Sequence, residues 1–176
     1  GTDISDVLVE RASELLPHGE FFTGSIDNSG ALPRATYDVT CSIGVMCYFD
    51  DIEQPLTNLV ESIKVGGTLL ISTMINPYPI DVVTRHRRSL IDGQGEWEIG
   101  WNIFSKQTYE YVLSRLHSRI SWHWREVVMP FALEKKPDPM RSWTIETEEN
   151  KYQLVNGASQ MINMQLLEIH VEKSGD

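Results

Sequence analysis

One short run, residues 37–45, constrains the fold of this chain more than any other segment. It reads YDVTCSIGV, so it is short, contains β-branched residues and is apolar at positions that face both sides of a sheet. A strand that protein covers on both faces is typical of parallel sheets, because their crossover helices pack on either side. The run therefore predicts a buried strand in an α/β domain.

Helical and extended patterns alternate around this run. Ser5 can cap a helix that ends at residues 17–19, and residues 20–26 are predicted to form a short strand. Pro55 lies in the first turn of a second predicted helix, which a glycine pair ends before a strand at 68–73. These units have the order expected of a parallel sheet.

The C-terminal half continues the alternation and then departs from it. Ser105 caps a third predicted helix, and strands follow at residues 120–129 and 164–173. No strong crossover helix separates these two strands, so they are expected to be antiparallel. The prediction is one α/β domain over residues 1–176: a doubly wound, mostly parallel sheet ending in an antiparallel hairpin, with ligands at the carboxyl ends of the strands.

Composition narrows the classes of partner. The formal net charge of −10 works against binding to nucleic-acid backbones, which need clustered Lys and Arg. No apolar run approaches the ~20 residues of a membrane span. Cys41 and Cys47 indicate neither a disulfide framework nor a metal site, so we expect a cytoplasmic protein with a small-molecule partner. Whether it forms a homo-oligomer stays open.

Residues 1–5 carry the first resemblance to a known family. They read GTDIS and resemble a segment of the class I (Rossmann-like) S-adenosylmethionine-dependent methyltransferases, in which an acidic residue ends the second strand and holds the ribose hydroxyls. The resemblance, which extends over nearly the whole chain, implies that Asp3, with Ile4 beside it, binds S-adenosylmethionine. A carboxylate can accept two hydrogen bonds from a vicinal diol. Alternatively, Asp3 helps to cap the following helix.

Residues 22–27, FTGSID, resemble the end of the family's third strand, where backbone amides and an acidic side chain meet the adenine. The resemblance implies adenine contacts from Gly24, Ser25, Ile26 and Asp27. Where the family commonly has Gly-Asp this chain has Gly-Ser, so the contact to the amino group can fall to Ser25, fall to Asp27 or be lost. Asp27 can equally be a turn residue.

Residues 37–48 give the most specific match, to the fourth strand and its exit loop. The resemblance implies that Ser42, Ile43 and Gly44 line the methyl-donor end of the cofactor, and glycine permits close backbone approach to a ligand. The apolar residues that follow can instead belong to the core. Residues 63–72 resemble the helix end, glycine turn and fifth strand of the family, a structural piece.

One part of the family's pattern has no counterpart. The first strand and its Gly-x-Gly-x-Gly loop are missing, and residues 92–95, DGQG, follow no strand and indicate a turn. This departure suggests that the chain is N-terminally truncated relative to the family, which leaves the activity of the truncated chain open.

Two connections are much longer than the ~2 to 6 residues of a plain strand-to-helix loop and are predicted to be substrate lids: residues 75–104 and 131–160. The first contains RHRR at 85–88, an anomaly in so acidic a chain. Arg85 or Arg88 is a candidate for binding a carboxylate or phosphate of the substrate. The alternative is a solvated helix face paired with nearby acids.

Aromatic residues of the first connection can wall the substrate pocket. Tyr78, Trp97 and Trp101 are the candidates, although aromatic side chains also pack a long loop against its own domain. Methyl transfer to a hydroxyl needs a base, for which Tyr48 and His86 are the first candidates and His123 the third. Each of these side chains can instead be structural.

The sequence thus predicts transfer of a methyl group from S-adenosylmethionine to a small or medium-sized metabolite that carries an anionic group. The alternative is a non-catalytic domain of the same fold that acts as an interaction module, and a nucleotide-sugar or dinucleotide enzyme is a weaker third reading. The methyl acceptor, the methylated atom and the oligomeric state stay open.

Overall fold

The computed structural model describes residues 1–88, 95–116 and 119–172. Its elements are, in chain order, β1 Thr2–Asp3, α1 Asp6–Leu15, β2 Phe22–Thr23, β3 Tyr37–Ile43, the short 3-10 helix η1 Met46–Tyr48, α2 Glu53–Glu61, β4 Ile63–Asn76, β5 Arg85–His86, β6 Glu98–Ile99, β7 Phe104–Ser105, α3 Lys106–Arg115, β8 Ile120–Glu126, β9 Trp143–Ile145, β10 Gln153–Val155, β11 Met161–Ile162 and β12 Met164–Val171.

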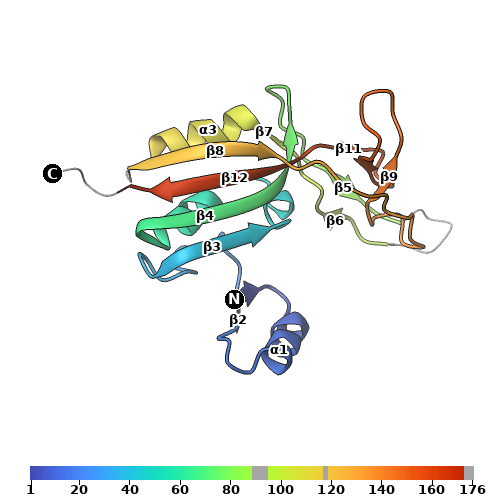
Figure 1. Ribbon diagram of the computed structural model, residues 1–176. Helices are drawn as coiled ribbons and strands as arrows, with labels where there is room; N and C mark the ends of the chain where they lie inside the picture. The colour runs from blue at the N-terminus through green and yellow to red at the C-terminus, as the bar shows by residue number, and fades with distance from the viewer. Residues whose placement is uncertain (89–94, 117–118, 173–176) are drawn as a thin grey trace.

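A central sheet in the order β3-β4-β12-β8 organises the molecule, with β7 pairing to the end of β4 (Figure 1). β3 and β7 run parallel to β4, whereas β12 is antiparallel to both β4 and β8. The predicted α/β class and the antiparallel end of the sheet are confirmed. The two last strands are shorter than predicted: β8 ends at Glu126 and β12 at Val171, and residue 173 lies outside the described residues.

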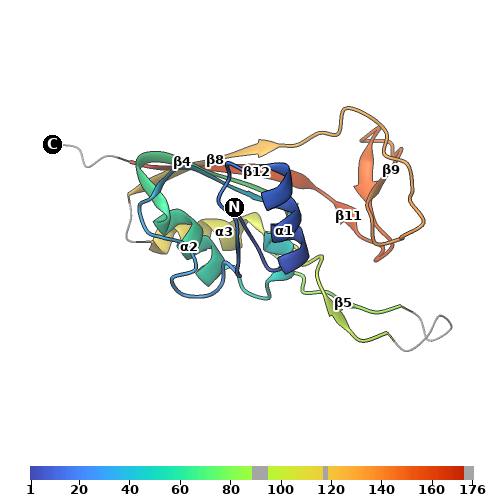
Figure 2. The ribbon, with the colours of Figure 1, turned by 90° about the horizontal axis from the view of Figure 1, so that it is seen from below.

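The core lies between this sheet and α2 and α3, which cover the same face (Figure 2). Leu69 and Ile71 of β4 and Leu167 of β12 are fully buried there, against Leu56 of α2 and Tyr109 of α3. Full burial of one such aliphatic side chain contributes about 1.5 to 3 kcal/mol. Trp122 and Trp124 of β8 also pack on this core.

The glycine pair does not end the second helix, contrary to the prediction. α2 stops at Glu61, and both glycines lie inside β4. Gly66 has a φ of +85°, and a Cβ on Gly67 would lie 2.7 Å from the backbone oxygen of Asp38. The glycines therefore serve a close approach between β3 and β4, whose register is irregular between Tyr37 and Val39.

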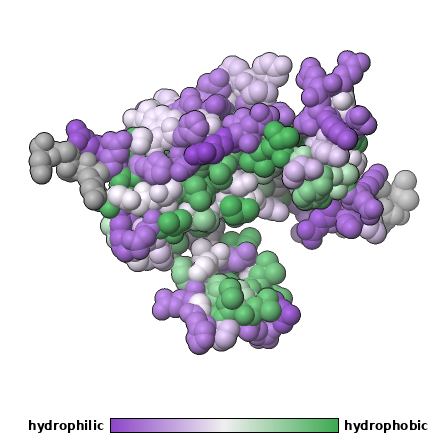
Figure 3. All heavy atoms as spheres, viewed as in Figure 1, coloured by the Kyte–Doolittle hydropathy of each residue, from purple (hydrophilic) through white to green (hydrophobic). Residues whose placement is uncertain are grey.

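The first residues form a separate unit, in which β1 and β2 pair in parallel and α1 connects them. The side chain of Ser5 accepts from Leu8 N, as predicted for an N-cap. However, α1 has no buried residue, and Leu8 and Leu15 are 56% and 63% exposed. Figure 3 shows this apolar surface on the unit. Among the described residues, β1 and β2 pair only with each other, and no strand joins them to β3 in the central sheet.

The two long connections fold into small sheets at one end of the central sheet (Figure 1). In the first connection β5 pairs with β6, so its arginines follow a strand and not a helix face. In the second, β9, β10 and β11 form an antiparallel sheet. Residues 89–94, which include most of the predicted turn at 92–95, lie outside the described residues.

Candidate active site

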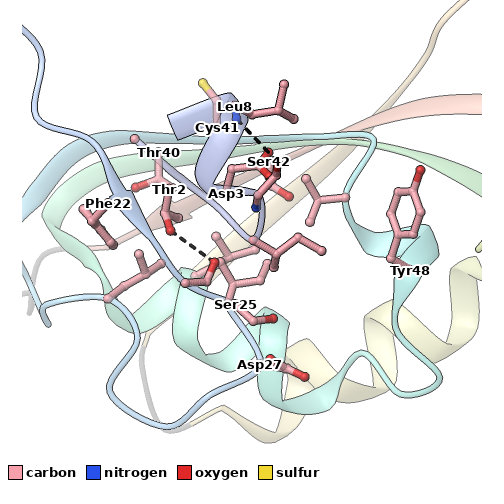
Figure 4. A pocket seen from close by; sticks show the side chains of 18 of the residues that line it. Thr2, Asp3, Leu8, Phe22, Ser25, Asp27, Thr40, Cys41, Ser42 and Tyr48 are labelled. Atoms are coloured by element: carbon pink, nitrogen blue, oxygen red, sulfur yellow. Dashed lines mark hydrogen bonds between the residues drawn. The ribbon is translucent and has the colours of Figure 1, made fainter. Parts of the chain in front are cut away.

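A cavity of about 860 Å³ lies between the N-terminal unit and β3, and we call it the strand-end cavity (Figure 4). Its volume falls in the range of small-molecule sites. Its walls come from β1, the residues after β2, β3 and η1. The residues that line it include Thr2, Asp3, Ile4, Ser5, Leu8, Gly24, Ser25, Ile26, Asp27, Val39, Thr40, Cys41, Ser42, Val45, Tyr48 and Phe49.

Seven of the nine residues predicted to bind the cofactor line this cavity: Asp3, Ile4, Gly24, Ser25, Ile26, Asp27 and Ser42. Ile43 and Gly44 do not. Ile43 is 65% exposed, because successive side chains of a strand point to opposite faces and its neighbour Ser42 points inward. Gly44 has a φ of +66° and donates to Ser72 O, so it shapes the turn after β3.

Two polar side chains suit this cavity to a polar ligand. One carboxylate oxygen of Asp3 accepts from Ser5 N at 2.9 Å, while the side chain stays exposed at the cavity. Ser42 is only 4% exposed, and its hydroxyl has no hydrogen-bond partner among the described residues. Buried hydroxyl groups are rarely left without a partner, so Ser42 indicates a position where a ligand supplies one.

Sequence reasoning missed the residue that fixes one wall. Asn58 of α2 is 7% exposed and donates to Ile26 O at 2.7 Å and to Asn28 O at 2.9 Å. These bonds hold the segment after β2 against the core, and with it Asp27. A polar residue on the inner face of a predicted helix was the available signal, since buried amides usually bond backbone groups.

A second cavity, of about 750 Å³, lies between the two long connections, and we call it the insertion cavity. The candidates His86, Arg88 and Trp101 line it. Residues that the sequence did not single out complete it: Asp138, Met140, Arg141, Ser142 and Gly157. Tyr48 lines both cavities.

Three predicted substrate residues lie outside the insertion cavity. The guanidinium of Arg85 is bonded to the carboxylate of Asp50, and this partner holds the pKa of Asp50 below its usual value. Trp97 lies under the guanidinium of Arg87, 4.7 Å from the ring centroid, and is 61% exposed. Tyr78 is 68% exposed.

Tyr48 is held against the first connection. Gly100, with a φ of +143°, lies so close that a Cβ there would be 3.1 Å from the Tyr48 ring. Burial and the neighbouring Cys47 raise the pKa of Tyr48, whereas the charge of Arg141 lowers it. With its pKa raised, the phenol keeps its proton at neutral pH and acts as a hydrogen-bond donor.

One ring nitrogen of His86 lies near a carboxylate, and the other has no partner among the described residues. Its Nε2 lies 3.8 Å from a carboxylate oxygen of Glu98, while Nδ1 is buried with no hydrogen-bond partner in the described part of the chain. A histidine nitrogen of this kind can take a proton from a ligand held nearby. Of the two candidate bases, His86 therefore fits the role better than Tyr48.

A strap of three residues, 100–102, ties the cavities together. Asn102, 1% exposed, accepts from Thr84 N at 2.7 Å and donates to Phe49 O at 2.7 Å and to Asp50 Oδ1 at 3.2 Å. From the second connection, Gln160 donates to Trp101 O at 2.9 Å. Both connections are thus anchored to each other and to the segment that carries Tyr48.

The described residues contain no group of three or more His, Cys, Asp or Glu side chains placed to hold a metal ion. Nor do they include a helix that is long and apolar enough to cross a bilayer.

Comparison with known proteins relates the N-terminal part of the chain to a family. Residues 1–71 match the family model described as a methyltransferase domain. These residues include β1 to β3, whose ends line the strand-end cavity. No curated protein sequence matches the chain.

Solved structures match over almost the whole length. An S-adenosylmethionine-dependent methyltransferase from Methanosarcina mazei superposes with a TM-score of 0.58 at 11% identity, over 98% of this chain and 82% of that one. One from Mesorhizobium loti gives 0.58 at 16% identity, over 97% and 79%. The DhpI–SAH complex gives 0.56 at 12% identity, over 98% and 65%. Residues 1–71 thus match a methyltransferase domain, and the chain as a whole shares its fold with S-adenosylmethionine-dependent methyltransferases.

Proposed function

We propose that this protein binds S-adenosylmethionine, the cofactor of the methyltransferases whose fold it shares, in the strand-end cavity and transfers the methyl group to a small or medium-sized metabolite in the insertion cavity. The observation that carries the proposal is the position of Tyr48, which lines both cavities. A methyl donor and its acceptor must meet in line, so two adjacent sites with a shared wall suit this reaction.

The residues of the strand-end cavity fit the cofactor by their chemistry. Asp3 offers a carboxylate for the ribose hydroxyls, and Ser25 or Asp27 can accept from the adenine amino group. The hydroxyl of Ser42, without a partner among the described residues, is available to the methionine portion. When bound, the cofactor supplies an electrophilic methyl group on a sulfonium.

On the acceptor side, Tyr48 donates a hydrogen bond that orients the acceptor. His86 takes the proton that a hydroxyl or amine acceptor loses on methylation. Trp101 supplies an apolar wall. Arg88 suits an acceptor with an anionic group, because the guanidinium fork matches a carboxylate or phosphate.

Calorimetry with S-adenosylmethionine and S-adenosylhomocysteine, on the product of the whole gene, tests the cofactor half of the proposal. Asp3→Asn should weaken binding on the order of 10-fold, because hydrogen bonds to a charged group are worth roughly 1.5 to 3 kcal/mol. Absence of binding of either compound to the unaltered protein would falsify methyl transfer and favour the non-catalytic module.

Asp51→Asn is the matched control. Asp51 accepts from Glu53 N at 2.7 Å before α2, as Asp3 accepts from Ser5 N before α1, but it does not line the cavity. Equal losses in the two variants would reduce Asp3 to a helix-capping residue.

A further inference from the structure

The insertion cavity concentrates positive charge in a chain whose net charge is −10. Arg87 and Arg88 come from the first connection, and Arg141 comes from the second. Among the described residues, the acidic ones that line the same cavity are Asp138 and Glu98. Glu98 is the neighbour of His86, which leaves Asp138 as the counter-ion of the arginines.

Arg88 and Arg141 share that one carboxylate. Arg88 Nη2 lies 3.8 Å from Asp138 Oδ1, and Arg141 Nε lies 4.0 Å from Oδ2. Both distances exceed the ~2.7 to 2.9 Å of a direct charge-assisted hydrogen bond. By contrast, Arg125 donates to Glu168 at 2.9 and 3.1 Å from two nitrogens. The two cavity arginines therefore keep most of their donors for another anion.

The loop that carries Asp138 and Arg141 is fixed in place. The Asp138 carboxylate accepts from Met140 N and the Asp138 backbone oxygen accepts from Arg141 N, both at 3.1 Å. Gly157 N donates to Pro139 O at 2.7 Å, and a Cβ on Gly157 would lie 2.5 Å from that oxygen. A preformed loop loses little backbone entropy on binding, so the position from which the Arg141 side chain extends is set before a ligand arrives.

Arg141 also lies close enough to Tyr48 for its charge to lower the pKa of the Tyr48 phenol. Both side chains line the insertion cavity, and Tyr48 lines the strand-end cavity as well. An anion at Arg141 therefore places the rest of its molecule near the wall that the two cavities share.

We propose that Arg88 and Arg141 together bind a carboxylate or phosphate group of the methyl acceptor above Asp138, so that each long connection contributes one arginine to one anion site. This inference rests on the proposed function only in making the anion part of a methyl acceptor. It makes Arg141 a specificity-determining residue. Two guanidinium forks that bind one planar or tetrahedral anion select acceptors that carry such a group.

Titration with inorganic phosphate and with succinate, followed by the fluorescence of Trp101, tests the site without a known acceptor. Tryptophan signals from elsewhere are subtracted with a Trp101→Phe titration. Arg141→Gln should weaken binding of the better anion about 10-fold, as expected when a charged hydrogen-bonding partner is lost. Arg141→Lys, which keeps the charge but loses the fork, should fall in between. The two probes distinguish a phosphate site from a carboxylate site.

Asp138→Asn gives the sharper result, because the proposal predicts a gain. The amide keeps the acceptor for Met140 N but removes the resident charge, so the anion should bind several-fold more tightly. Arg115→Gln is the control: Arg115 lies on α3 against Tyr111, does not line the cavity and should leave binding unchanged. Circular dichroism confirms that each variant is folded.

Loss of anion affinity in Asp138→Asn, or unchanged affinity in Arg141→Gln, would overturn the site, and so would failure of both probes to bind at millimolar concentration. The titration uses no cofactor, and calorimetry with S-adenosylhomocysteine is done separately on the same variants. Anion binding without cofactor binding would retain the anion site and reject methyl transfer. The reverse result would retain the methyltransferase and reject the arginine pair.

Discussion

The strand-end cavity and the insertion cavity differ in how the chain builds them. Residues 1–49 supply nearly the whole wall of the first, from strand ends and the turns after them. The second draws on Tyr48, on residues 86–88, 98, 99 and 101 of the first connection and on residues 138–142, 157 and 158 of the second. A site at strand ends follows from the topology of an α/β sheet, whereas a site between connections depends on how each connection folds.

The two cavities also differ in chemistry. Apolar side chains such as Leu8 and Val39 alternate with a few polar ones in the first. The second gathers arginines, a histidine and acids within one small volume. In the proposed function the first cavity is the cofactor side and the second is the acceptor side, and three predictions can break or sharpen this division.

The largest effect is expected at the strap. Asn102→Ala leaves Phe49 O and Thr84 N without their partner, and each unsatisfied buried group costs about 1 to 3 kcal/mol, so the free energy of unfolding should fall by roughly 2 to 4 kcal/mol. Urea denaturation measures this loss. Affinity for S-adenosylhomocysteine should change less than affinity for anions in the insertion cavity.

Asn76→Ala is the control, because the Asn76 side chain makes a comparable but exposed bond to Ile80 O. Its cost should stay below about 1 kcal/mol. Equal loss of affinity in both cavities of Asn102→Ala would contradict the separation of the two sites.

A middle-sized effect is expected at Gly100, where the two cavities should respond together. In Gly100→Ala the alanine must keep a strained φ, and its Cβ presses on the Tyr48 ring. The free energy of unfolding should fall by about 1 to 3 kcal/mol. Because Tyr48 lines both cavities, calorimetry should show weaker binding of S-adenosylhomocysteine and of anions alike.

Gly30→Ala separates backbone strain from the contact with the ring. Gly30 has a φ of +76°, and a Cβ added there would meet open space, so its variant should lose stability but keep both affinities. If Gly100→Ala behaves in the same way, the ring of Tyr48 is not the wall that couples the cavities.

The smallest effect concerns pH and the exposed pair of Asp50 with Arg85. The hydrogen bond from Arg85 lowers the pKa of Asp50 in the folded protein, with a further contribution from Asn102. The stabilisation is therefore complete above the unfolded value, about 3.9, and is lost as the pH falls through the lower folded value. Asp50→Asn should remove this part of the acid dependence and leave stability at neutral pH only slightly reduced.

Urea denaturation of the two proteins between neutral and acidic pH measures the difference, which should shrink on acidification. A difference that grows as the pH falls would mean that the pair does not stabilise the first connection.

The sequence predicted the sheet and its antiparallel end because these depend on local patterns. Residues 37–43 form a strand as predicted, although most of its side chains are exposed and not buried, and Ser5 and Ser105 cap helices through bonds to residues three positions later. Such signals lie within a few residues of one another. The residues predicted to bind the cofactor come together for the same reason: Asp3, Gly24 and Ser42 each lie at a strand or directly after one, and all three line one cavity.

The sequence is misleading where contacts between segments far apart in the chain determine the role of a residue. The glycine pair at 66–67 has the pattern of a helix stop, but its role is a close approach to β3. Arg85, a candidate for binding an anion, instead pairs with Asp50, 35 residues away in sequence. Nothing near Arg141 in sequence marks it, and its importance comes from Arg88 and Tyr48 lying beside the same cavity.

By itself, the sequence determined the α/β class, the order of the main elements and the set of residues at the strand ends, because hydrophobic periodicity and capping act over one or two turns of chain. Only the tertiary structure decided that two cavities share Tyr48, that Asn102 ties the first connection to the segment that carries Tyr48 and that Arg141 joins Arg88. These relations depend on contacts between residues far apart in sequence, and such contacts exist only once the connections have packed.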